Sequence, residues 1–138
     1  MRMLLLSLIL ILASCGKSEG DKIMRYEIKT IDSAVLQQIL IDGNSISYFI
    51  FLPQRNKSVE SELKLKSDRI VKIRQLIKNV GSINCKYNEF ADDQIIEIES
   101  DSKKIVCRES SLHSYPQILS LVSEFRILTR EIIEILEK

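Results

Sequence analysis

A long amphipathic pattern near the C-terminus constrains the fold of this chain more than any other feature. Apolar residues recur every three or four positions over residues 118–136, with others beside them: Ile118, Leu119, Leu121, Val122, Phe125, Ile127, Leu128, Ile132, Ile133, Ile135 and Leu136. This spacing predicts a helix with a wide apolar stripe. Ser114 and Gln117 have the spacing of a capping box, and Pro116 suits the first helical turn. Such a stripe normally covers a sheet; the alternative is a partner site or a dimer seam.

Strand patterns upstream supply the sheet that this helix needs. Alternating polarity or a strand-type composition occurs in four segments: 23–30, 45–52, 59–66 and 94–107. The last of these predicts a hairpin with a polar turn at residues 100–102. Residues 34–41 fit either a short helix or a strand. The turn signal Asp42-Gly43-Asn44 and the strand that follows favour a hairpin, so we expect a strand there.

A second helix is predicted in the middle of the chain. Ser67 or Asp68 can cap its start and Gly81 can end it, and one side carries Ile70, Ile73, Leu76, Ile77 and Val80. The opposite side is basic, with Arg69, Lys72, Arg74 and Lys78. This basic side is either a solvated surface or a docking face for an acidic partner or anionic lipid.

These elements predict one α+β domain over residues 23–138. We expect an antiparallel sheet of about five strands with two helices packed on one face, in the order βββαββα. This order loosely resembles small protease-inhibitor and cystatin-like domains. The resemblance is one of topology alone and implies no functional residues.

The N-terminus has the layout of a secretory signal. Met1-Arg2-Met3 provides a positive start, Leu4 to Leu12 an apolar run, and Ala13-Ser14 the small residues of a cleavage site before Cys15. This arrangement resembles the lipobox of bacterial lipoproteins, which implies that the thiol of Cys15 is acylated and the preceding peptide removed. The alternatives are an ordinary secretory signal or a transmembrane anchor, for which the run is about half the 20 residues needed.

The lipobox divides the chain into three parts. Residues 1–14 are predicted to be the signal peptide, residues 15–22 a flexible tether that is small and charged, and residues 23–138 the domain. Membrane lipid then holds the protein through acylated Cys15 in the cell envelope. Because Gly16 replaces the aspartate that often retains such proteins in the inner membrane, we expect the outer membrane, facing the periplasm, in a Gram-negative host. In a Gram-positive host, the same anchor would hold the domain on the outer surface of the cytoplasmic membrane.

Two cysteines remain beyond Cys15, and an envelope compartment favours a disulfide between Cys85 and Cys107. The pattern predicts that this bridge joins the end of the middle helix to the sheet. Two separate buried thiols are the alternative. A zinc pair is disfavoured because His113 is the only histidine and neither cysteine has a ligand nearby.

Composition and motifs disfavour several function classes. Removal of Arg2 with the signal leaves 19 basic and 19 acidic side chains, which argues against a nucleic-acid partner. The possible catalytic or calcium-binding fragments have no complete motif: Ser110, Ser111 and His113, and the carboxylates Glu89, Asp92 and Asp93. No glycine-rich phosphate loop is present. We therefore expect no enzyme activity, catalytic residue, metal site or cofactor.

These exclusions favour a non-catalytic binding module. We expect a lipid-anchored protein that binds a protein partner, such as an inhibitor or immunity protein against a periplasmic hydrolase or toxin. The alternative is a structural accessory subunit of an envelope assembly that docks through its last helix. A minor hydrolase that uses His113 is a third hypothesis.

Overall fold

The computed structural model describes residues 23–52, 55–65, 67–85 and 94–138, so the predicted signal, tether and Cys15 lie outside the described residues. The elements in chain order are β1 (Met24–Lys29), β2 (Val35–Asp42), β3 (Ser45–Leu52), β4 (Lys57–Lys64), α2 (Asp68–Lys78), β5 (Ile83–Asn84), β6 (Ile95–Ser100), β7 (Lys103–Arg108), the 3-10 helix η3 (Glu109–Ser114) and α3 (Pro116–Leu136).

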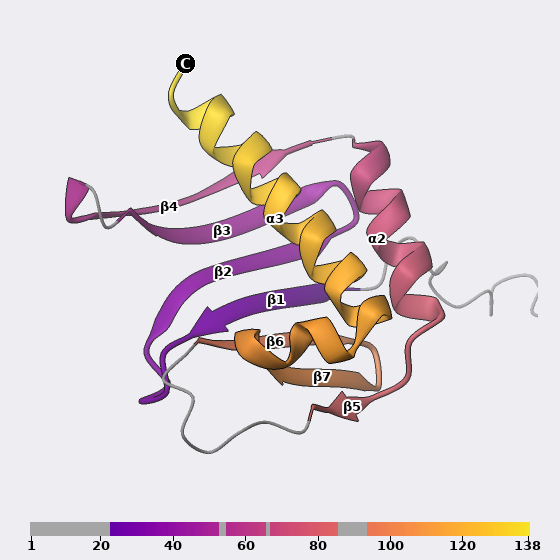
Figure 1. Ribbon diagram of the computed structural model, residues 1–138. Coiled ribbons are helices and arrows are strands. Elements are labelled where there is room, and N and C mark those ends of the chain that lie inside the picture. The colour runs from indigo at the N-terminus through magenta and orange to yellow at the C-terminus, as the bar shows by residue number, and fades with distance from the viewer. Residues whose placement is uncertain (1–22, 53–54, 66, 86–93) are drawn as a thin grey trace, which may run out of the picture.

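The strands form one seven-stranded sheet in the order β4-β3-β2-β1-β6-β7-β5. All neighbouring pairs are antiparallel except β5 and β7, which are parallel. Helices α2 and α3 lie on the same face of this sheet (Figure 1). The predicted α+β class and the antiparallel hairpins are therefore confirmed.

The predicted number of about five strands and the predicted order βββαββα were wrong, because four strands precede α2 and three strands lie between α2 and α3. Strand β4 begins at Lys57, two residues before the predicted segment 59–66, and it pairs with β3 along its whole length as an edge strand. The two-residue strand β5 was not predicted, because a segment that short has no measurable periodicity. Residues 34–41, the ambiguous segment, form β2 and pair with both β1 and β3. The β2–β3 turn requires Gly43, whose φ of 60° lies in the left-handed region.

The helix ends differ in part from the predictions. The side chain of Ser67 accepts a hydrogen bond from the Arg69 amide, as an N-cap does. Gly81 does not end α2, which stops at Lys78 with Asn79 as its C-cap. The capping-box prediction was also wrong, because Ser114 belongs to η3 and the N-cap of α3 is Tyr115, without a side-chain cap. In the described part of the chain, we find no helix with the length and hydropathy to cross a bilayer.

The core lies between the sheet and α3. The rings of Tyr26 on the central strand and Phe125 on α3 stack with centroids 4.4 Å apart, and both side chains are fully buried. Burial raises the pKa of Tyr26 to about 12, and the nearby Arg126 guanidinium opposes only part of this effect. Among the described residues, the Tyr26 hydroxyl finds no hydrogen-bond partner. The stripe of α3 thus covers the sheet, as predicted.

Candidate functional site

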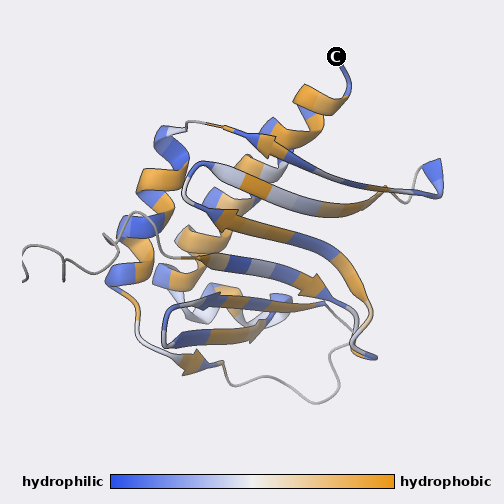
Figure 2. Cartoon of the chain, turned by 180° about the vertical axis from the view of Figure 1, so that it is seen from behind, coloured by the Kyte–Doolittle hydropathy of each residue, from blue (hydrophilic) through white to orange (hydrophobic). Residues whose placement is uncertain are grey.

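The face of the sheet opposite the two helices is not covered by another described element, and we call it the open face. Figure 2 shows it in front of the helices. Side chains alternate between the faces of a strand, so the residues between the core positions lie here. In the central strands these include Arg25, Glu27, Lys29, Leu36, Gln38, Leu40, Phe49, Phe51, Glu97 and Glu99.

One half of the open face is apolar. Leu36 and Leu40 on β2 and Phe49 on β3 are partly buried, and Phe51 at the end of β3 is 36% exposed. The facing residues of edge strand β4 include the exposed Glu60. Aromatic and aliphatic side chains on an uncovered sheet are typical of protein-binding surfaces when polar residues surround them.

The other half of the open face is an ionic network centred on Glu27 and Glu97. These two carboxylates lie opposite one another in the β1–β6 pair, an arrangement that is unfavourable unless cations intervene. Lys29 Nζ lies 3.1 Å from a carboxylate oxygen of each. Arg25 also contacts both, at 3.2 Å from Glu27 and 3.6 Å from Glu97. The two cations therefore hold the like charges together.

The network also extends to the neighbouring strands. Gln38 on β2 donates to Glu27 at 3.0 Å, Lys104 on β7 lies 3.1 Å from Glu97, and Arg25 pairs with Glu99 at 2.5 Å. The cations Arg25, Lys29 and Lys104 balance the carboxylates Glu27, Glu97 and Glu99, so the network itself has no net charge. Glu27 is 4% exposed although no helix covers it, because its ionic partners surround it.

The ionic contacts shift the titration of two network members. Burial acts to raise the pKa of Glu97, but hydrogen bonds from Lys104 and Lys29 outweigh it and hold the pKa below the ordinary value. The hydrogen bond to Glu27, followed by that to Glu97, raises the pKa of Lys29. Both shifts favour the charged forms of Glu97 and Lys29.

Glu97→Gln is expected to lower the free energy of unfolding at pH 7 by about 1 kcal/mol, because Lys29 and Lys104 lose an anionic acceptor. A lowered pKa means that the Glu97 carboxylate stabilises the fold above the ordinary value of 4.5. This contribution is lost as the pH falls through the lower folded-state pKa. Urea unfolding of variant and wild type should therefore differ at pH 7 and converge in acidic buffer, once the pH is below the folded-state pKa of Glu97.

The matched control is Glu60→Gln. It removes an exposed carboxylate that edge strand β4 presents on the open face. We expect a change within about 0.5 kcal/mol at both pH values. An equal effect of the two substitutions would show that the network around Glu97 has no special stabilising role.

A pocket of about 600 Å³ lies beside α2, at the end of the sheet that holds the β2–β3 and β6–β7 turns. We call it the α2 pocket. Its lining includes Met24, Ile70, Val71, Arg74, Lys78 and Lys103. Its volume falls in the range of small-molecule sites, which is about 300–1,000 Å³.

The basic side of α2 is divided between two roles. Arg69 Nε lies 2.9 Å from Glu131 and Lys72 Nζ lies 2.7 Å from Glu124, and Arg69 also pairs with Glu124. These contacts join α2 to α3. Hydrogen bonds from Lys72 and then Arg69 lower the pKa of Glu124 against the effect of its burial. Arg74 and Lys78 instead line the α2 pocket, so the basic side is not a uniform solvated surface.

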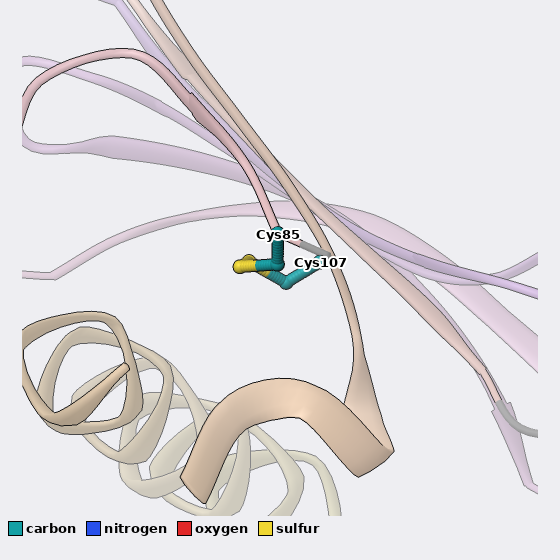
Figure 3. The surroundings of a disulfide bond; sticks show 2 residues. All are labelled: Cys85 and Cys107. Atoms are coloured by element: carbon teal, nitrogen blue, oxygen red, sulfur yellow. A yellow bond between two sulfur atoms is a disulfide. The ribbon is translucent and has the colours of Figure 1, made fainter. Parts of the chain in front are cut away.

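The predicted disulfide between Cys85 and Cys107 is present. The two Cα atoms are 4.8 Å apart and both side chains are buried. In Figure 3 the sulfur atoms project from the strands toward the helical side of the sheet. The prediction that this bridge joins the end of a helix to the sheet was wrong, because Cys85 follows β5. It joins that edge segment to β7, where the Cys85 amide also donates to the Val106 carbonyl at 2.9 Å.

The structure does not assemble the weak catalytic fragments of the sequence. Ser110, Ser111 and His113 lie in η3, a 3-10 helix, and Ser111 is buried while His113 is exposed. The carboxylates Glu89, Asp92 and Asp93 lie outside the described residues. Within residues 23–52, 55–65, 67–85 and 94–138, no three His, Cys, Asp or Glu side chains are grouped to hold a metal ion.

Sequence reasoning missed both the ionic network and the α2 pocket. The alternation of Arg25, Glu27 and Lys29 in β1 showed that one side of this strand is charged. Their partners on β6 and β7 are more than 60 residues away, and only strand order brings them together. The pocket likewise combines residues from two turns and a helix.

Comparisons of the chain with protein-family models, curated proteins and solved structures find no match.

Proposed function

We propose that this protein is a lipid-anchored component of the bacterial cell envelope that binds a protein partner through the open face of its sheet, without chemistry of its own. An inhibitor or immunity protein against a periplasmic hydrolase or toxin has these properties. In a Gram-negative host, acylated Cys15 would hold the domain at the outer membrane, facing the periplasm. Mass spectrometry of protein from its native host tests the anchor, and an unmodified Cys15 would contradict it.

The observation that carries the binding role is the uneven covering of the sheet. Both long helices pack on one face, and the open face combines Leu36, Leu40, Phe49 and Phe51 with a neutral ionic network. Apolar anchors beside polar groups that already satisfy one another suit a protein interface. The alternative docking face on α3 has less support, because Ile118, Phe125 and Ile132 are buried against the sheet.

Phe51→Ala is expected to weaken binding of the partner by about tenfold or more, since truncated aromatic anchors dominate the loss of affinity at interfaces. The partner is first identified by placing a photoreactive residue at Phe51 in the native host and recovering the cross-linked protein. Affinity of the purified pair is then measured for wild type and variant by calorimetry.

The matched control is Ile135, an apolar residue at the end of α3 that is somewhat more exposed than Phe51, at 44% against 36%. A photoreactive residue there should recover no such partner, and Ile135→Ala should leave its affinity unchanged. Cross-linking from Ile135 alone would instead support the accessory-subunit hypothesis and contradict the use of the open face.

A further inference from the structure

The α2 pocket lies where the chain enters the folded domain. Met24, the first residue of β1, lines this pocket. It pairs with Ile41 before the β2–β3 turn and with Ser100 before the β6–β7 turn, so the start of β1 lies at the same end of the sheet as both turns. The segment that precedes β1 therefore joins the domain next to the pocket.

The α2 pocket has an apolar floor. The helix residues Ile70 and Ile77 share its lining with Met24, and each of the three is less than 10% exposed. Val71 also lines the pocket, but 55% of its surface is exposed in spite of its apolar side chain, which places it at the mouth. An aliphatic chain bound here would cover Val71, and this is favourable in proportion to the apolar area buried.

The charged groups around the pocket already have partners within the protein. Lys103 Nζ donates to two backbone carbonyls at the end of α2, each at 3.0 Å. Arg74 Nη2 donates to the carbonyl of Gly43 at 3.4 Å, and Lys78 and Asp101 also have interaction partners in the chain. What the pocket offers to a ligand is therefore its apolar surface, and an aliphatic chain needs nothing else.

We propose that the α2 pocket holds one acyl chain of the lipid on Cys15 when the protein is away from a bilayer. Such a chain exists only if Cys15 is acylated, so this site rests on the function proposed above. Cys15 lies nine residues before Met24, and nine residues span up to about 30 Å when extended, so the chain can reach the pocket. Residues 16–22 contain no apolar side chain, so the acyl group is what this segment brings to the floor.

Covalent attachment makes even weak binding sufficient. A short linker gives the attached group an effective concentration of about 1 mM. A single fatty chain binds a bilayer with an association constant of only about 10⁴ M⁻¹, and a pocket of equal affinity would be filled about ten times as often as empty. A free lipid at micromolar concentration has no such advantage. The captured chain is hidden from water, so the protein exposes less apolar surface when it leaves a membrane.

The test uses the chain from residue 15 to residue 138, which contains the whole described core and both bridged cysteines. Cys15 is the one remaining cysteine, so its thiol can be alkylated selectively with a 12-carbon chain that ends in a diazirine. The sample is illuminated at low concentration without detergent. The monomer is then isolated, and mass spectrometry locates the residues that carry the cross-link.

We expect most cross-links at Met24 or within α2, at least about tenfold above a sample unfolded in urea. Cross-links mainly within β2 and β3 would place the chain on the open face and overturn the proposal. A pattern equal to that of the unfolded sample would also overturn it, because the chain would then have no binding site on the domain.

Val71→Glu places a carboxylate at the mouth of the α2 pocket and should reduce the α2 cross-links by about tenfold or more. Val35→Glu is the matched control, because it makes the same change at a valine that is 38% exposed. Val35 pairs with Lys29, at the far end of β1 from Met24, so the cross-links should change by less than about twofold. Equal losses in the two variants would contradict the assigned site.

Mass spectrometry of the protein from its native host separates this site from the proposed anchor. An acylated Cys15 together with an absence of α2 cross-links would overturn the pocket site and leave the anchor intact. An unmodified Cys15 would overturn both, because no acyl chain would then be present to fill the pocket.

Discussion

Phe125→Ala is expected to lower the free energy of unfolding by about 3–5 kcal/mol, the usual cost of emptying a fully buried aromatic site. Phe125 is 0% exposed, and its ring stacks on Tyr26 with an interplanar angle of 3°. Truncation removes this contact and leaves a cavity between α3 and the central strand β1. Because domains of this size are stable by only about 5–15 kcal/mol, a large share of the total is at stake. Urea unfolding followed by circular dichroism measures the change.

The chain provides a matched control in Phe51→Ala. The same side chain is lost, but Phe51 is 36% exposed on the open face and has no helix above it. We expect a loss of less than about 1 kcal/mol. Similar losses at the two positions would mean that α3 does not pack on the sheet through Phe125. The control also shows that any loss of partner binding in Phe51→Ala is not caused by unfolding.

Removal of the disulfide is expected to destabilise the fold by about 3 kcal/mol, through the entropy of the unfolded chain. The bridge closes a loop with a sequence separation of 22 residues. The variant Cys85→Ala/Cys107→Ala avoids a free thiol, and its denaturation midpoint should match that of the reduced wild type. The loss of stability should be greatest at the edge of the sheet formed by β5, because this strand has only two residues and few ladder hydrogen bonds of its own.

Two measurements check this prediction for the disulfide. Urea unfolding with and without dithiothreitol should show a lower midpoint for the reduced wild type, whereas the double-alanine variant should not respond to the reductant. Hydrogen exchange should show the largest loss of protection at β5 and β7. If the oxidised and the reduced wild type have the same urea midpoint, the bridge does not stabilise the domain.

Elements with a strong local period were predictable from sequence. The spacing of Ile118, Phe125 and Ile132 identified α3 and its buried face, and the polar turns after Ile41 and Ser100 identified two hairpins. Errors occurred where tertiary contacts override local signals. Ser114 has the residue type of a cap, yet it belongs to η3, and the N-cap of α3 is Tyr115. Strand β5 exists only because β7 supplies its hydrogen-bond partners.

The sequence by itself determined the α+β class, the hairpins, the buried stripe of α3 and the pairing of Cys85 with Cys107. It did so because periodicity and turn chemistry act over a few residues, and because only one cysteine pair was available in the domain. Strand order was decided by the tertiary structure alone. Placing β1 between β2 and β6 brings Glu27 beside Glu97, and placing α2 over the ends of the hairpins brings Arg74 near Lys103. Both candidate sites depend on residue pairs that are distant in sequence. No local pattern selects such pairs, because the packing of whole strands and helices on one another decides which elements become neighbours.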